Sequence, residues 1–222
     1  MSHYLARRLA LILGAVMRAR PLLIVLAAGR GSRFAADGHK LEQPLEGLTL
    51  FARTLVSAIA SHLPVLVVTT QMLEAQARHF VAARDVVVLP DAGSAVELGM
   101  GYSIATGVGA RPDAPGWVLL PADMPLVQPS TMAAVARALD QHPIAYAQHR
   151  GRRGHPVGFS SELYSELVTL TGDQGARRLI ARYPAHAVEV DDPGVLVDVD
   201  TEEDLIALRA AHQQASAAAH PK

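Results

Sequence analysis

Short apolar runs alternate with longer stretches of mixed polarity along the chain. The apolar runs are rich in valine, isoleucine and leucine, which favour strands. They predict strands at Leu22–Ala27, Val65–Thr69, Val86–Leu89, Trp117–Leu120, Ile144–Ala147, Ala187–Val190 and Val195–Val199. Several of these runs are apolar at consecutive positions, which is typical of strands that are covered on both faces.

The longer stretches between the runs predict helices. They fall at Leu48–Ser61, Gln71–Ala83, Ala95–Val108, Ser130–Gln141, Ser160–Leu170, Gly175–Tyr183 and Thr201–His212. Capping oxygens and early acidic residues mark helix starts at 129–131 and 200–204. Strands that alternate with helices of this length predict a single-domain, three-layer, Rossmann-like α/β fold with a mostly parallel central sheet. Ligands bind beyond the carboxyl ends of the strands in such sheets, so the residues just after each strand are the informative ones.

The two ends of the chain differ from its middle. An apolar run at Leu9–Met17 lies between arginines, but it is too short to span a bilayer and no Ala-x-Ala-like cleavage site follows it. We expect residues 1–20 to be an N-terminal extension, residues 21–212 to form one domain, and residues 213–222 to be a flexible tail.

Composition narrows the class of protein. Half of the 222 residues are hydrophobic, 18% are charged and the formal net charge is −1. These values are typical of a compact domain, and the net charge gives no overall electrostatic attraction to nucleic acid. The chain has no cysteine, which excludes disulfides, iron–sulfur clusters, cysteine-based zinc sites and thiol nucleophiles. We expect a cytoplasmic protein that binds neither nucleic acid nor a membrane.

The stretch LLIVLAAGRGSRFAADGHK, residues 22–40, ends a predicted strand in a glycine-rich loop. A Walker P-loop requires Gly-Lys-Ser/Thr, whereas Lys40 stands between His39 and Leu41. A dinucleotide fingerprint requires a third glycine where this chain has Phe34. What remains is a loop whose glycines let backbone amides approach phosphate, while Arg33 and Lys40 add positive charge.

The glycine loop and several later segments resemble the MobA-like nucleotidyltransferases, and in particular their molybdenum cofactor cytidylyltransferase branch. The resemblance runs from about Pro21 to Leu208. The segments that carry it are Leu26–Arg33 with Lys40, Gly99–Ile104, Leu120–Pro125, Gly154–Val157, Gly172–Arg177 and Asp198–Thr201. The chain departs from the family at Phe34-Ala35, where Met-Gly is common, and the gap from Arg33 to Lys40 is slightly long.

The resemblance implies a nucleotide site and two catalytic cations, Lys40 and Arg33. The nucleotide-binding residues it implies are Leu26, Ala27, Ala28, Gly29, Arg30, Gly31, Ser32, Asp91, Gly99 and Ser103. Ala28 favours CTP, because the cytidylyl branch reads Leu-Ala-Ala-Gly and the guanylyl branch Leu-Ala-Gly-Gly. The simpler interpretation of Gly99, Gly101 and Ser103 is close helix packing.

Three aspartates are candidates for holding Mg²⁺, with Mn²⁺ as an alternative ion. Asp123 follows the Trp117–Leu120 strand, and its simpler role is to cap the next turn. Asp198 and Asp200 end the last predicted strand, where residues two apart share a face. Asp200 is equally suited to cap the following helix, so the choice between these two stays open.

The most basic segment, HRGRRGHPVGF, supplies candidate acceptor-binding residues. Arg152, Arg153 and His155 are suited to an anionic acceptor such as a phosphorylated pterin, and Asp173 and Arg177 are further candidates. The simpler interpretation of this segment is a solvated hairpin.

The resemblance implies transfer of CMP from CTP to the molybdenum cofactor, with release of pyrophosphate. An acceptor phosphate would attack the α-phosphorus in line, and no general base is needed because the nucleophile is already an anion. Other interpretations are GTP as donor, a sugar or alcohol phosphate as acceptor, or a non-catalytic nucleotide-binding maturation factor. The expected partners are the two small-molecule substrates and a molybdenum hydroxylase or its chaperone, and the expected state is a monomer or weak dimer.

Overall fold

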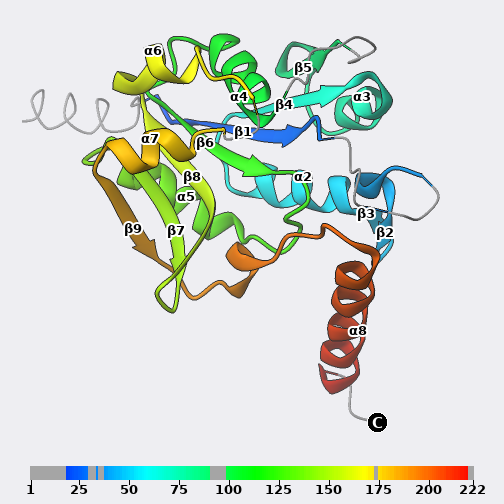
Figure 1. The fold of residues 1–222 in the computed structure, drawn as a ribbon. Helices are drawn as coiled ribbons and strands as arrows, with labels where there is room; N and C mark the ends of the chain where they lie inside the picture. Colours follow the sequence, from blue (N-terminus) through cyan, green and yellow to red (C-terminus); the bar gives the residue numbers. More distant parts are fainter. Residues whose placement is uncertain (1–18, 30–33, 35–37, 91–98, 173–174, 220–222) are drawn as a thin grey trace, which may run out of the picture.

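A computed structural model describes residues 19–29, 34, 38–90, 99–172 and 175–219 of the chain. Its centre is a seven-stranded sheet in the order β5-β4-β1-β6-β8-β7-β9 (Figure 1). The strands are β1 Leu22–Ala27, β4 Val65–Thr70, β5 Val86–Leu89, β6 Gly116–Pro121, β7 Ile144–His149, β8 Arg152–Ser160 and β9 Ala185–Glu189. Within this sheet only β8 runs antiparallel to its neighbours, which confirms the mostly parallel sheet predicted from the sequence.

Helices cover both faces of the sheet and form the outer layers (Figure 1). One face carries α2 Leu50–Ala60, α3 Gln71–Arg78 and α5 Pro129–Ala138, and the other carries α4 Met100–Gly109, α6 Tyr164–Leu167 and α7 Arg177–Arg182. The last helix, α8 Glu202–Ala219, extends away from the body and continues beyond the predicted end at His212. The short elements are η1 Lys40–Glu42, β2 Pro44–Leu45, β3 Leu48–Thr49, η2 Ala83–Asp85, η3 Ser161–Leu163 and η4 Pro193–Leu196. No helix in the described ranges combines the length and apolarity that crossing a membrane requires.

Strand β1 shows why consecutive apolar residues predict a strand covered on both faces. Leu23, Val25 and Ala27 belong to the core under α2, α3 and α5, whereas Leu22 and Ile24 belong to the core under α4, α6 and α7. The strand pairs in parallel with β4 on one side and β6 on the other. The carboxyl ends of β1 and β6 therefore meet at one edge of the sheet, which we call the carboxyl edge.

The predicted strand at Val195–Val199 is wrong. Residues 193–196 form the 3₁₀ helix η4, which Pro193 opens. The buried carboxylate of Asp192 accepts hydrogen bonds from the Gly194 N–H (3.0 Å) and from the hydroxyl of Thr131 (2.7 Å), and so fixes this turn against α5. Val195 is fully buried because η4 packs on β8, not because it pairs within the sheet.

Strand β8 was not predicted. Its first residues are exposed and basic, while Pro156, Val157, Gly158 and Phe159 are buried. It forms a hairpin with β7 through a turn at Arg150 and Gly151, both of which have positive φ (50° and 75°). Because β8 also pairs with β6, the basic segment begins at the carboxyl edge of the sheet.

Candidate active site

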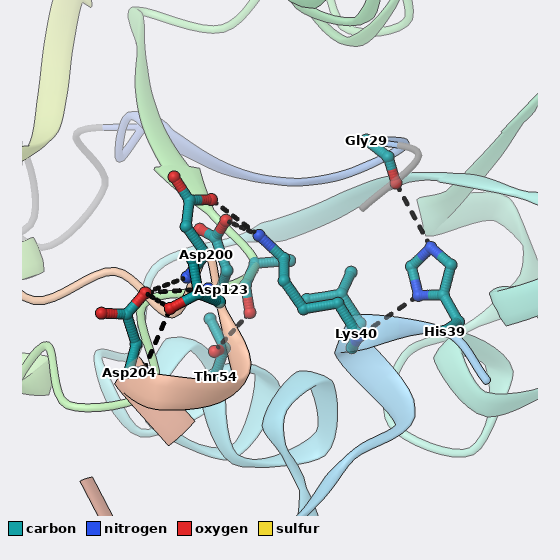
Figure 2. Close-up of polar contacts among 10 residues, drawn as sticks. Gly29, His39, Lys40, Thr54, Asp123, Asp200 and Asp204 are labelled. Atoms are coloured by element: carbon teal, nitrogen blue, oxygen red, sulfur yellow. Dashed lines mark hydrogen bonds and ion pairs between the residues drawn. The ribbon is translucent and has the colours of Figure 1, made fainter. Parts of the chain in front are cut away.

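Lys40 enters the carboxyl edge as the first residue of η1. The N-cap of this helix is His39, whose Nδ1 accepts a hydrogen bond from the Leu41 N–H (3.2 Å). Its Nε2 lies 3.2 Å from the carbonyl oxygen of Gly29 (Figure 2). A neutral imidazole with its proton on Nε2 satisfies both contacts. His39 therefore joins Gly29, the second residue after β1, to the start of η1, a role that no sequence signal indicated.

The ammonium group of Lys40 lies between two carboxylates (Figure 2). Its Nζ is 2.7 Å from Asp123 Oδ2 and 3.0 Å from Asp200 Oδ1, and Lys40 is only 8% exposed. Burial alone would lower the pKa of Lys40, but the charges and hydrogen bonds of Asp123 and Asp200 outweigh it and raise the pKa above 10.5. Lys40 is therefore a cation at neutral pH.

Backbone and hydroxyl contacts hold Asp123 in place. The preceding residue, Ala122, donates its N–H to the carbonyl of Leu26 in β1 (3.0 Å). The fully buried hydroxyl of Thr54 in α2 donates to the carbonyl of Ala122 (2.8 Å) and approaches that of Leu50 (3.1 Å). The loop after β6 is thus tied to both β1 and α2. Thr54 was not predicted, because a threonine within an amphipathic helix carries no special sequence signal.

Asp200 reaches the same point from the distant end of the chain. The N–H of Val199 donates to the carbonyl of Asp123 (3.0 Å), which places the two segments side by side. The carboxylate of Asp204 accepts from the N–H groups of Asp200 (3.0 Å) and Thr201 (2.8 Å), and the Thr201 hydroxyl accepts from the N–H of Asp204 (3.2 Å). The predicted helix start at 200–204 is confirmed, with Thr201 as its cap. The carboxylate of Asp200 binds Lys40 instead.

Asp198 and Asp200 do not share a strand face, because no strand forms at these residues. The side chain of Asp198 is exposed, whereas Asp200 is partly buried against Lys40. The two aspartates therefore occupy different surroundings.

The donor set at Asp123 and Asp200 fits a hard divalent cation. Asp123 Oδ1 is buried and has no hydrogen-bond partner within the described part of the chain. Across the same residues, no three histidine, aspartate or glutamate side chains gather as a complete metal cage. Mg²⁺ commonly uses one or two carboxylates and completes its shell with water and substrate phosphates, so this pair is sufficient.

His155 lies close to this carboxylate pair. Leu119 of β6 pairs with Val157 of β8, and extending this antiparallel register brings His155 beside the end of β6, just before Asp123. Burial lowers the pKa of His155, so the ring is neutral at pH 7. Smaller effects come from the charges of Asp123 and Asp198, which raise the pKa, and of Arg153 and Arg177, which lower it. Its Nδ1 has no hydrogen-bond partner among the described atoms.

The basic residues of the hairpin face outward. Arg152 and Arg153 are exposed, and the Arg153 guanidinium lies 4.7 Å from the ring centre of Tyr146. Gly154 is required by packing, since a Cβ there would lie 2.1 Å from the Val195 carbonyl oxygen. Arg152 and Arg153 are therefore solvated, as the simpler interpretation expects, whereas residues 156–159 of the same segment are buried.

The start of α4 also meets the segment that carries the remaining acceptor candidates. Gly99 is the N-cap of α4, and Ser103 is buried in its first turns. The N–H of Gly101 donates to the carbonyl of Gly172 (2.9 Å), and a Cβ at Gly101 would lie 2.7 Å from the Thr171 oxygen. Close packing therefore accounts for Gly101. The hydrogen bond from Gly101 to Gly172 joins the predicted nucleotide segment to the chain that precedes Arg177.

The remaining predicted site residues divide into two groups. Leu26 and Ala27 are the last residues of β1, and Ala28 and Gly29 follow them at the carboxyl edge. Arg30, Gly31, Ser32, Arg33, Asp91 and Asp173 lie outside the described residues.

The chain is similar to known proteins over most of its length. The family model of the MobA-like NTP transferase domain matches residues 23–189. Purine catabolism protein PucB of Bacillus subtilis (strain 168) is 32% identical over 202 residues, which cover 85% of this chain and 95% of PucB. The crystal structure of Rv0371c from Mycobacterium tuberculosis H37Rv superposes with a TM-score of 0.73 at 28% identity, over 86% of this chain and 98% of Rv0371c. A structure of Rv0371c in complex with manganese gives a TM-score of 0.71 at 27% identity, over 86% and 99% of the two chains.

Proposed function

The chain belongs to the MobA-like NTP transferase family, and from this premise we propose that it moves CMP from CTP to a phosphorylated pterin, the molybdenum cofactor, with release of pyrophosphate. Nucleotidyl transfer is the activity of the family, and the choice of CTP and pterin is our proposal. The observation that carries the proposed transfer reaction is the Lys40 ammonium held between Asp123 and Asp200 at the carboxyl edge. A phosphoryl reaction centre needs positioned charge of both signs at one point.

In this proposal the acceptor phosphate attacks the α-phosphorus in line and pyrophosphate leaves. Backbone amides of residues 29–32 bind the β- and γ-phosphates, and Lys40 and Arg33 stabilise the charge that builds on the phosphoryl oxygens. The contact of His39 with Gly29 supports this assignment, because it ties the start of the glycine loop to the residue before Lys40.

Asp123 and Asp200 are the residues that would hold Mg²⁺ or Mn²⁺. The orphaned Asp123 Oδ1 and the proximity of Asp200 favour this pair, with Asp198 as the third candidate. The ion would supply charge neutralisation between the phosphates. The manganese complex of Rv0371c supports a divalent ion in this fold.

The acceptor would bind on the side of His155. Arg152, Arg153 and Arg177 supply positive charge there, the neutral His155 supplies a hydrogen-bonding ring, and Asp173 completes the assignment. Ala28 favours CTP over GTP, because its methyl group fills space that a purine would need. Residues 21–212 would form the catalytic domain, between an extension at 1–20 and a flexible tail at 213–222. A molybdenum hydroxylase or its chaperone would receive the product, and the enzyme would act as a monomer or weak dimer in the cytoplasm.

A nucleotide and acceptor panel tests this proposal. Pyrophosphate release would be measured with CTP, GTP, ATP and UTP, with Mg²⁺, and with molybdopterin, a sugar phosphate or no acceptor. We expect release only with CTP and molybdopterin, and mass spectrometry should identify a cytidine dinucleotide of the pterin. Pyrophosphate release with GTP or with a sugar phosphate would show that the reaction is nucleotidyl transfer but that the proposed substrates are wrong. Nucleotide binding without release under every condition would instead indicate a maturation factor.

A further inference from the structure

The Lys40 ammonium binds the same two carboxylates that would hold a metal. It binds Asp123 Oδ2 at 2.7 Å and Asp200 Oδ1 at 3.0 Å, in a setting where the Lys40 side chain is only 9% exposed. A dication on the same two carboxylates would lie within a few ångströms of the ammonium, in surroundings that screen charge poorly. The two cations therefore compete for one pair of anions.

We propose that Lys40 is the resident counter-ion of the Asp123–Asp200 pair, and that a divalent cation displaces it. The inference rests on the proposed function in one respect, namely that the released ammonium has a phosphate to bind. Charge balance favours the exchange: one ammonium leaves the two carboxylates with a net charge of −1, whereas one dication neutralises them. The four-carbon stem of lysine lets the ammonium swing from the carboxylates towards a triphosphate. Lys40 would then reach its catalytic position only after the metal has bound.

The sequence makes this exchange directly observable. The chain contains only two lysines, Lys40 and Lys222. Protein labelled with ¹³C at lysine Cε should therefore give two signals, and a Lys222→Arg variant assigns the one that remains to Lys40. Titration with Mg²⁺ in the absence of nucleotide should move the Lys40 signal towards that of solvated lysine. A Lys40 signal that stays unchanged while Mg²⁺ binds would overturn the proposal.

Metal affinity provides a second readout that does not depend on turnover. Free Mn²⁺ would be measured by electron paramagnetic resonance for the wild type, Lys40→Met and Lys40→Arg. Lys40→Met should bind Mn²⁺ about tenfold or more tightly than the wild type, because the competing charge is gone, while Lys40→Arg should not. Arg78→Met is the matched control, since it removes one positive charge from an ion pair with Glu74 within α3. Equal affinity in wild type and Lys40→Met, or no Mn²⁺ binding by either, would contradict the competition.

These readouts separate the inference from the proposed function. If Mg²⁺ moves the Lys40 signal but no nucleotide is turned over, the exchange stands and the assigned reaction is wrong. If CMP transfer occurs while the Lys40 signal ignores Mg²⁺, the reaction stands and the exchange is wrong. The wild-type titration also decides the question if Lys40→Met fails to fold.

Discussion

Charged residues lie at both edges of the central sheet, but they are open to solvent at the amino edge and largely buried at the carboxyl edge. At the amino ends of β1, β4 and β6 lies an open cavity of about 630 Å³, whose lining includes Arg20, Asp85 and Arg111. Asp85 and Arg111 are half-buried and form an ion pair (2.9 Å), and the exposed Arg20 donates to the His62 carbonyl (2.8 Å). At the carboxyl edge the cation is almost fully buried, and an oxygen of Asp123 has no partner among the described atoms.

This difference in burial, and not the volume of a cavity, is our reason for placing the proposed chemistry at the carboxyl edge. Charges at the amino edge are solvated and hydrogen-bonded, so they offer a ligand little beyond weak surface attraction. Burying Lys40 and two carboxylates costs free energy, and such an arrangement is typical of sites where charge is used. The following changes test the contrast, from the largest expected effect to the smallest.

Replacing Lys40 with methionine should abolish most of the activity at the carboxyl edge. We expect nucleotidyl transfer to fall about 10³-fold, because the group that we propose to stabilise phosphoryl charge is lost. Steady-state pyrophosphate release measures this, and circular dichroism with thermal melting confirms folding. Near-wild-type turnover by a folded variant would remove Lys40 from the reaction.

Replacing Thr54 with valine should weaken the support of Asp123. The Ala122 carbonyl would lose its donor in a fully buried position, which should lower the free energy of unfolding by about 1–3 kcal/mol. Turnover should also fall, since the loop that carries Asp123 loses its tie to α2. Urea unfolding and kcat would be measured beside Thr106→Val, whose hydroxyl donates to the Tyr102 carbonyl within α4 (2.8 Å). Equal losses in both variants would show that Thr54 has no special role at the site.

Replacing Arg111 with leucine should have little effect at the amino edge. The ion pair with Asp85 is partly exposed, so the free energy of unfolding should change by no more than about 1 kcal/mol. Turnover should remain within about twofold of the wild type. A large loss of activity would place function at the cavity and reverse the comparison.

The smallest expected effect is a pH dependence that arises from His155. Burial lowers the pKa of His155 in the folded state below its unfolded value of about 6.5. Its contribution to stability is therefore complete above pH 6.5 and is lost as the pH falls towards the lowered value. Between pH 7 and 5 the wild type should lose more free energy of unfolding than His155→Gln, as measured by urea titration. Parallel pH profiles would show that His155 is not shielded from solvent.

Most strands of the sheet and two residues of the candidate site could be predicted from local sequence. Strands such as β1 and β6 are buried on both faces, so their sequences are apolar at consecutive positions and predict strands. The position just after the Trp117–Leu120 strand indicated Asp123, and the glycine-rich loop with its cations indicated Lys40. Strand β8 was missed because its first half is basic and exposed, and Val195–Val199 was mistaken for a strand because packing under β8 buries Val195.

The pairing of Lys40 with Asp123 and Asp200 could not be predicted from local sequence. Lys40 is 83 residues from Asp123 and 160 from Asp200 in the sequence. Their meeting depends on tertiary contacts such as the Val199 N–H to the Asp123 carbonyl, which no local pattern encodes. The choice of Asp200 over Asp198 as the neighbour of Lys40 likewise needed the structure.

The most direct test of the central claim is the position of the metal in a complex. Crystals grown with CTP and Mn²⁺ would be measured at the manganese absorption edge, where anomalous scattering locates the ion without reference to the protein. We predict an anomalous peak beside Asp123, with the triphosphate next to Lys40. A peak in the amino-edge cavity, or a triphosphate bound away from Lys40, would contradict the account.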